Sequence, residues 1–179
     1  MTTTRRGLLI GGSWVEGGGA GYEVVNPATE AVVGVAPEST PDDARAAAAA
    51  AAEAFPAWSR TTPEERAALL DKVADLLEAR LSELVPLVQA ETGATLAVTT
   101  SLQIPQAVTR FRRYAKGALE PTRIALPPGQ QAATPLAAGG LISAVAVRQP
   151  VGVVAAITSY NFPMTNMAGK ICPALAMGN

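Results

Sequence analysis

The sequence predicts an α/β fold, in which hairpins and helices precede one buried strand and the helix that follows it. Two helix-start motifs, each a threonine, a proline and two acids, occupy residues 40–43 and 62–65. The pair Gly11-Gly12 separates two short apolar runs, as in a β-hairpin. The continuous apolar run at 151–157, "VGVVAAI", is typical of a strand buried on both faces of a parallel sheet.

The N-terminal part is expected to form short strands and turns. Gly11 and Gly12 tolerate positive φ at both turn positions, which favours a hairpin there. The runs "YEVV" at 22–25 and "AVVGVAP" at 31–37 are two further strands, and Asn26-Pro27 ends the first of them.

Two long helices are expected next, and each begins at a threonine N-cap. Proline follows Thr40 and Thr62 at the first helical position, and Glu65 completes a capping box with Thr62. Seven consecutive alanines at 46–52 favour the first helix. The second carries an apolar stripe at helical spacing, which predicts a packed face: Leu69, Leu70, Val73, Leu76, Leu77, Leu81 and Leu84.

Prolines divide the helical region that follows. Pro86 predicts a break, with Ser82 as a possible new N-cap and Gly93 as the end of the helix. A further helical segment is expected from Thr95 to about Leu119, interrupted at Pro105. Its basic cluster indicates either a phosphate site or a solvated helix face: Arg110, Arg112, Arg113 and Lys116.

Composition excludes several kinds of site. The chain has no histidine and one cysteine, so it cannot form a Ser-His-Asp or Cys-His site or the usual zinc sites, and no metal is expected. Cys172 lies in an apolar helix without a nearby base, which favours a buried structural role. With a net charge of −1 and 4% aromatic residues, neither nucleic acid nor a membrane is an expected partner. The short apolar stretch after the N-terminal arginine pair is no secretory signal, so a cytoplasmic protein is expected.

Asn161 is the candidate with a chemical role. Ligands of open α/β sheets bind beyond the carboxyl ends of the strands, where residues 158–161 would lie. Its side-chain amide could donate to an oxyanion that develops on a carbonyl. Alternatively, Asn161 caps the helix that begins near Pro163. Spacing alone leaves both interpretations open.

The last 31 residues, "QPVGVVAAITSYNFPMTNMAGKICPALAMGN", resemble the aldehyde dehydrogenase superfamily. Its members read P-x-G-V-x-x-x-I-x-P-W-N-F-P, followed by an apolar helix that ends K-x-x-P-A-L-A-x-G-N. Upstream segments agree in order, among them "GGSWVEG", "VVNPATE" and "ETGA", so the resemblance covers the whole chain. Two departures stand out: Ser159-Tyr160 replaces Pro-Trp, and Ala94 replaces the lysine of E-T-G-K.

The resemblance implies oxidation of an aldehyde to a carboxylic acid with NAD or NADP, through a thiohemiacetal and a thioester. It implies that Asn161 helps to stabilise the oxyanion. It also implies that Ile157, Thr158, Ser159 and Tyr160 line the nicotinamide ribose and phosphate region. Residues 1–122 would then be strands and helices of the cofactor-binding domain, residues 123–148 an oligomerisation β-arm, and residues 149–179 the first βα unit of a Rossmann-like sheet.

The resemblance further implies that the chain corresponds to the N-terminal portion of such an enzyme. The family's nucleophilic cysteine and general-base glutamate would follow Asn179, so these residues alone are expected to be inactive. The arm implies a homo-oligomer, either a dimer or a tetramer. The alternative is a truncated, non-catalytic paralogue that pairs with a full-length subunit through its arm.

Overall fold

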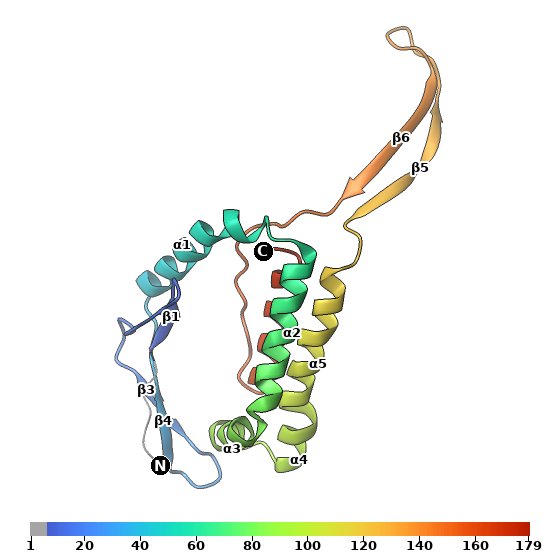
Figure 1. The fold of residues 1–179 in the computed structure, drawn as a ribbon. Helices are drawn as coiled ribbons and strands as arrows, with labels where there is room; N and C mark the ends of the chain where they lie inside the picture. Colours follow the sequence, from blue (N-terminus) through green and yellow to red (C-terminus); the bar gives the residue numbers. More distant parts are fainter. Residues whose placement is uncertain (1–6) are drawn as a thin grey trace.

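Three helices form the core of the computed structural model, which describes residues 7–179. Helix α2 (Pro63–Ala79) lies beside α5 (Ile104–Ala118), and α6 (Pro163–Ala176) packs against both (Figure 1). Their contact surface is rich in alanine, which lets helix backbones approach closely. The fully buried side chains include Leu70, Ala74, Ile104, Ala107, Ala168 and Cys172.

Two antiparallel hairpins precede the helices: β1 (Leu8–Ile10) with β2 (Ser13–Val15), and β3 (Tyr22–Val25) with β4 (Val32–Ala36). The turn between β1 and β2 contains Gly11 at φ 58° and Gly12 at φ 79°. Both lie in the left-handed region that glycine adopts without strain. The expected hairpin at Gly11-Gly12 and the two further expected strands are confirmed, and those two strands also pair with each other.

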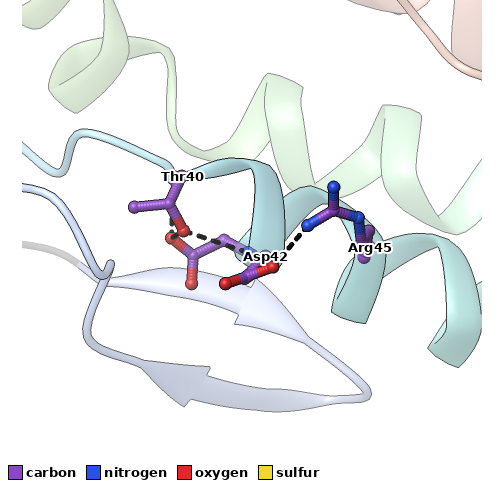
Figure 2. A network of polar contacts seen from close by, with 4 residues as sticks. Thr40, Asp42 and Arg45 are labelled. Atoms are coloured by element: carbon purple, nitrogen blue, oxygen red, sulfur yellow. Dashed lines mark hydrogen bonds and ion pairs between the residues drawn. The ribbon is translucent and has the colours of Figure 1, made fainter.

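Capping boxes begin the first two long helices, and the sequence predicted the one at Thr62. At the start of α1 (Pro41–Trp58), Asp43 N–H donates to Thr40 Oγ1 over 3.2 Å, and Thr40 N–H donates back to Asp43 Oδ2 over 2.8 Å. Figure 2 shows Thr40 beside the ion pair between Asp42 and Arg45, whose atoms are 2.5 Å apart. Asp43 thus completes a second box that the sequence interpretation had found only at Thr62. No residue of α1 is fully buried, so its alanines stabilise a helix rather than a packed face.

The predicted break at Pro86 is wrong. Helix α2 ends at Arg80, and α3 (Leu81–Thr92) contains Pro86 in its interior. Ser82 is not the N-cap, because the helix begins earlier and its N-cap is Arg80, which makes no side-chain capping hydrogen bond. A proline removes a single helical hydrogen bond, a loss that one helix can absorb. Gly93 ends the helix at φ 70°, as expected.

The region around Pro105 contains a π-helix. Helix α4 (Leu96–Val98) leads into the π-helical segment η1 (Thr99–Gln103), and α5 follows directly. The Ile104 N–H donates to the carbonyl of Thr99, five residues earlier. Pro105 has no backbone N–H to donate to a carbonyl of the preceding turn, and the π-helical turn ends directly before it. The helical segment from Thr95 to about Leu119 is therefore confirmed, with the interruption moved just ahead of the proline.

The apolar stripe of α2 is only partly buried. Leu70 is fully buried, and Val73 and Leu77 of α2 pack against the core, as does Leu84 of α3. In contrast, Leu69 is 42% exposed and Leu76 is 54% exposed. These two leucines are seven residues apart and therefore share a second helix face outside the core.

A long hairpin projects from the helices (Figure 1). Strands β5 (Arg123–Gln131) and β6 (Gly140–Val147) pair antiparallel, and every residue of both strands is exposed. The extended arm expected after Leu119 is confirmed as a structural element. None of the helices within residues 7–179 is long and apolar enough to cross a membrane.

The predicted strand at residues 151–157 is not formed. The segment runs beside the helices without a strand partner among the described residues, and Val151 and Ile157 are 86% and 84% exposed. A continuous apolar run indicates burial on both faces, but a strand also needs neighbours for its backbone hydrogen bonds. At its start, Val151 and Gly152 N–H groups donate to Asn179 Oδ1 over 2.6 and 3.1 Å.

Candidate functional site

The turn into α6 places Asn161 next to the helix without making it the cap. The N-cap is Phe162, whose carbonyl accepts from Asn166 N–H over 2.8 Å, and Pro163 is the first helical residue. No side chain caps this helix end. The capping interpretation of Asn161 is therefore wrong, and its side chain is available for another role.

The Asn161 carboxamide takes part in a small hydrogen-bond network with Ser159 and Asn166. Its Oδ1 accepts from Ser159 Oγ over 2.8 Å and from Asn166 Nδ2 over 3.5 Å. Asn166 Nδ2 also donates to Ser159 Oγ over 2.6 Å. No residue within 7–179 accepts a hydrogen bond from Asn161 Nδ2. The amide oxygen is thus occupied, while the amide NH2 remains an available donor on an exposed side chain.

The π-helical segment η1 holds this turn through hydrogen bonds. Gln103, fully buried at the end of η1, donates from Nε2 to the Asn161 carbonyl over 3.3 Å. Thr165 Oγ1 in turn donates to the carbonyls of Leu102 and Gln103 over 2.9 and 3.1 Å. Arg110 of α5 donates to the Thr165 carbonyl. Side chains of two other segments therefore fix the first turn of α6.

The four residues expected to line the cofactor site precede Asn161 directly. All of Ile157, Thr158, Ser159 and Tyr160 are exposed, Tyr160 by 90%. The Thr158 hydroxyl has no partner among the described residues. An exposed apolar side chain, two hydroxyls and the nearby positive end of α6 suit a ligand with ribose and phosphate groups.

A cavity lies beside the residues that precede this segment. It measures about 310 Å³ and is lined by α1, by residues 152–156 and by α6. Its walls are mostly apolar, with Phe55, Trp58, Ile171 and Leu175 among them, and Asn161 does not line it. The polar groups therefore converge at the exposed turn rather than in this cavity.

The remaining sequence candidates have structural roles. Cys172 is fully buried in the core, and this burial raises the pKa of its thiol to about 11, which removes it as a nucleophile. Arg110 is bound to a carbonyl of α6, and Arg112 pairs with three acids of α2, so they form no phosphate site. Lys170 is exposed on α6. No group of potential metal ligands occurs within residues 7–179.

Comparison with known proteins identifies the family. The model of the aldehyde dehydrogenase family matches residues 14–179. The chain belongs to the aldehyde dehydrogenase family. Human 2-aminomuconic semialdehyde dehydrogenase is 38% identical over 154 residues, which cover 86% of this chain and 30% of the human protein. Aminoaldehyde dehydrogenase 2 of Zea mays is 37% identical over 184 residues, with 99% and 35% covered.

Solved aldehyde dehydrogenase structures have the same fold over nearly the whole chain. An NADP-dependent enzyme from E. coli superimposes with a TM-score of 0.86 and is 33% identical, covering 97% of this chain and 34% of its own. Betaine aldehyde dehydrogenase from Staphylococcus aureus, solved with NAD+, gives a TM-score of 0.84 at 29% identity, with 97% and 33% covered. These relatives confirm the α/β N-terminal fold of the family and agree with NAD or NADP as cofactor. The chain spans about a third of the length of the relatives it matches.

Within this aldehyde dehydrogenase chain, sequence reasoning found Asn161 but missed the residues that hold it. Asn166 and Gln103 lie outside the motif that identified the turn. Asn166 comes five residues after Asn161, and Gln103 comes fifty-eight residues before it. No local pattern distinguishes Gln103 from any other polar helix residue. The one sequence signal for the hydrogen-bond network is that three serine or asparagine residues, Ser159, Asn161 and Asn166, lie close together around a helix start.

Proposed function

We propose that this chain supplies the oxyanion donor and part of the nicotinamide cleft of an NAD(P)-dependent aldehyde dehydrogenase, which converts an aldehyde to a carboxylic acid. One observation carries the proposal: the Asn161 carboxamide has its oxygen hydrogen-bonded and its NH2 group available, beside the positive end of α6. Family membership supports the reaction class. A cytoplasmic location stays a prediction.

Asn161 acts where negative charge develops. When a thiolate adds to an aldehyde carbonyl, the carbonyl oxygen becomes an alkoxide, and an oriented amide N–H stabilises that charge more than it stabilises the neutral carbonyl. The thiolate must come from outside these 179 residues, because Cys172 is the only cysteine and is buried. The contribution of this chain is therefore electrostatic stabilisation and orientation.

The segment from Ile157 to Tyr160 would bind the cofactor. Bound NAD+ or NADP+ would supply the hydride acceptor for the oxidation. The exposed Ile157 side chain offers apolar contact, and the hydroxyl of Thr158 offers a hydrogen bond to a ribose or phosphate oxygen. The proposal places Asn161 at the reacting carbonyl and these residues at the cofactor.

The projecting hairpin supports assembly into a homo-oligomer, either a dimer or a tetramer. Its exposed apolar side chains include Leu126, Leu141, Ile142 and Val145, with Leu141 at 72% exposure. Apolar side chains and an open strand edge on a hairpin without packing partners favour pairing with another chain. The same feature supports the alternative of a non-catalytic partner of a longer subunit. Sedimentation of the purified chain and of its Leu141→Lys variant would measure this: a lower mass for the variant is expected, and equal masses would contradict the role of the hairpin.

Replacement of Asn161 by alanine tests the catalytic role. In the longest natural protein that carries this sequence, Asn161→Ala should lower kcat for aldehyde oxidation by about 10²–10³-fold, the range for loss of one oxyanion donor. KM for the aldehyde should change little, because the interaction strengthens only in the transition state. NADH or NADPH formation at 340 nm is a suitable readout in an assay with about 1 mM of a simple aldehyde.

Gln106 provides the matched control. It is an exposed amide on α5 with no hydrogen bond to other described residues, so Gln106→Ala should keep the wild-type kcat. A full kcat in Asn161→Ala would refute the oxyanion role. Absence of turnover in the longest natural protein would favour the non-catalytic partner instead.

A further inference from the structure

The hydrogen bonds around Asn161 have a defined polarity. A carbonyl oxygen only accepts, so the Asn166 atom 3.5 Å from the Ser159 carbonyl is the NH2 nitrogen. The same nitrogen donates to Ser159 Oγ over 2.6 Å, and the serine hydroxyl then donates its own proton to Asn161 Oδ1 over 2.8 Å. Polarity thus passes from Asn166 through Ser159 to Asn161, and it leaves the NH2 of Asn161 as the outward donor.

The backbone of the turn is held independently of this network. Gln103 binds the Asn161 carbonyl from the buried end of η1, and Thr165 ties the first turn of α6 to the same segment. The Asn161 carbonyl and the first turn of α6 are therefore held by contacts that involve neither the Ser159 nor the Asn166 side chain. What those two side chains determine is the orientation of the carboxamide about its last side-chain torsion, which is broad and roughly two-fold for asparagine.

We propose that Ser159 and Asn166 are positioning residues for aldehyde oxidation, which hold the Asn161 carboxamide with its NH2 group toward the developing oxyanion. This inference rests on the proposed function of Asn161. A half-turn of the carboxamide would present its oxygen to a negative oxygen, which replaces attraction by repulsion. Ser159 therefore has a second role beside the cofactor contact expected from its place in the motif.

The Asn166→Asp variant reverses the polarity without changing the shape. A carboxylate only accepts, so the Ser159 hydroxyl turns to donate to it and offers Asn161 a lone pair. The carboxamide then rotates to donate to Ser159, and its oxygen faces the reacting carbonyl. We expect kcat to fall about 10²-fold, close to the effect of losing the donor. Ser159→Ala, which only frees the rotation, should cost about tenfold, the order of one lost hydrogen bond, whereas Ser159→Thr keeps the hydroxyl and should retain most of the rate.

A double-mutant cycle separates positioning from other effects. Ser159→Ala and Asn166→Asp are each made in the wild type and in Asn161→Ala, within the longest natural protein that carries this sequence. Once the carboxamide is gone, neither change should lower kcat by more than about twofold, because interacting residues are not additive. Equal losses in both backgrounds would overturn the proposal, since the two side chains would then act on the cofactor, on local charge or on the fold.

A spectroscopic measurement distinguishes failure of this inference from failure of the proposed function. In the chain labelled with ¹⁵N-asparagine, the side-chain NH2 signals of Asn161 are those lost in Asn161→Ala. Ser159→Ala and Asn166→Asp should shift these signals, and Ser159→Thr should leave them near their wild-type positions. Unshifted signals would overturn the network. Shifted signals together with a full kcat in Asn161→Ala would instead overturn the oxyanion role on which the inference rests.

Discussion

Replacement of Arg66 by methionine removes a buried cation that joins the start of α2 to the end of α6. Arg66 lies in the first turn of α2 and is only 7% exposed. Its Nε donates to the carbonyl of Ala176, the last residue of α6, over 3.0 Å. Its Nη1 donates to the Thr61 carbonyl and lies 3.4 Å from Thr61 Oγ1. The guanidinium therefore binds the Ala176 carbonyl at the C-terminus of α6, where a positive charge is favourable.

The expected change in the free energy of unfolding follows from the hydrogen bonds that are lost and from the charge that no longer has to be buried. Two hydrogen bonds from a charged donor contribute about 3–6 kcal/mol together. Methionine fills a similar volume and needs no desolvation of a cation, which offsets part of that loss. A net destabilisation of about 2–4 kcal/mol is expected for Arg66→Met, because the buried Ala176 carbonyl is left without its donor. Arg66→Lys keeps the charge but not the fork geometry, and should lose about half as much.

Urea unfolding followed by circular dichroism measures the effect. With a slope of about 2 kcal/mol per molar urea, the midpoint of Arg66→Met should fall by about 1–2 M. Arg60 is an exposed arginine nearby, so Arg60→Met should leave the midpoint within about 0.3 M of the wild type. A midpoint for Arg66→Met equal to that of Arg60→Met would refute the role assigned to the buried guanidinium.

Three further predictions concern packing and ionisation. A Cβ at Gly169 would collide with the Arg110 guanidinium that binds the Thr165 carbonyl, so Gly169→Ala should lower the Tm by displacing it, at a cost of about 1–3 kcal/mol. Burial raises the pKa of Cys172 to about 11. The thiol should therefore react with iodoacetamide only as fast as the chain unfolds. The free energy of unfolding should fall as the pH rises from about 8.5 toward 11, because the thiol ionises first in the unfolded chain. The backbone N–H groups of Thr40 and Gly18 lower the pKa of Asp43, so the contribution of this carboxylate to stability is present above about pH 4 and is lost as the pH falls through its folded pKa. Asp43→Ala should therefore destabilise the chain at pH 7 and have a smaller effect in acid. Urea unfolding at both pH values measures the difference.

Each of these predictions has an outcome that contradicts it. An unchanged Tm for Gly169→Ala would show that the Arg110 side chain moves aside without loss. Alkylation of Cys172 faster than unfolding would show that the helix opens locally around it. An equal effect of Asp43→Ala at neutral and acidic pH would show that the carboxylate charge contributes nothing to the capping box.

Local signals in the sequence predicted the elements whose causes are local. The capping motifs at Thr40 and Thr62, the Gly11-Gly12 turn and the stop at Gly93 each act within a few residues, and all four stand as expected. The prediction of a break at Pro86 was wrong. A proline destabilises a helix by removing a hydrogen bond, but whether the helix continues through it also depends on the packing of the rest of the helix.

The apolar run at 151–157 shows the limit of pattern reasoning. Its composition indicates a buried strand, yet a strand exists only when neighbours complete its hydrogen bonds. Among the described residues no strand lies beside it, and the segment stays exposed. The stripe of α2 shows the same limit, since Leu70 is buried and Leu69 is not. Periodicity identifies an apolar side chain, and the neighbouring elements decide its burial.

For the candidate site, the sequence by itself determined the residue type and its place: an asparagine in a family motif, directly before a proline-initiated helix. It could not distinguish a helix cap from a catalytic donor, because both uses require the same amide at the same position. The tertiary structure excluded the helix cap. It made Phe162 the cap, brought Gln103 under the turn from a distant helix, and occupied the Asn161 oxygen with Ser159 and Asn166. Hydrogen-bond direction depends on which partners surround a group in space, and that information is absent from the order of residues along the chain.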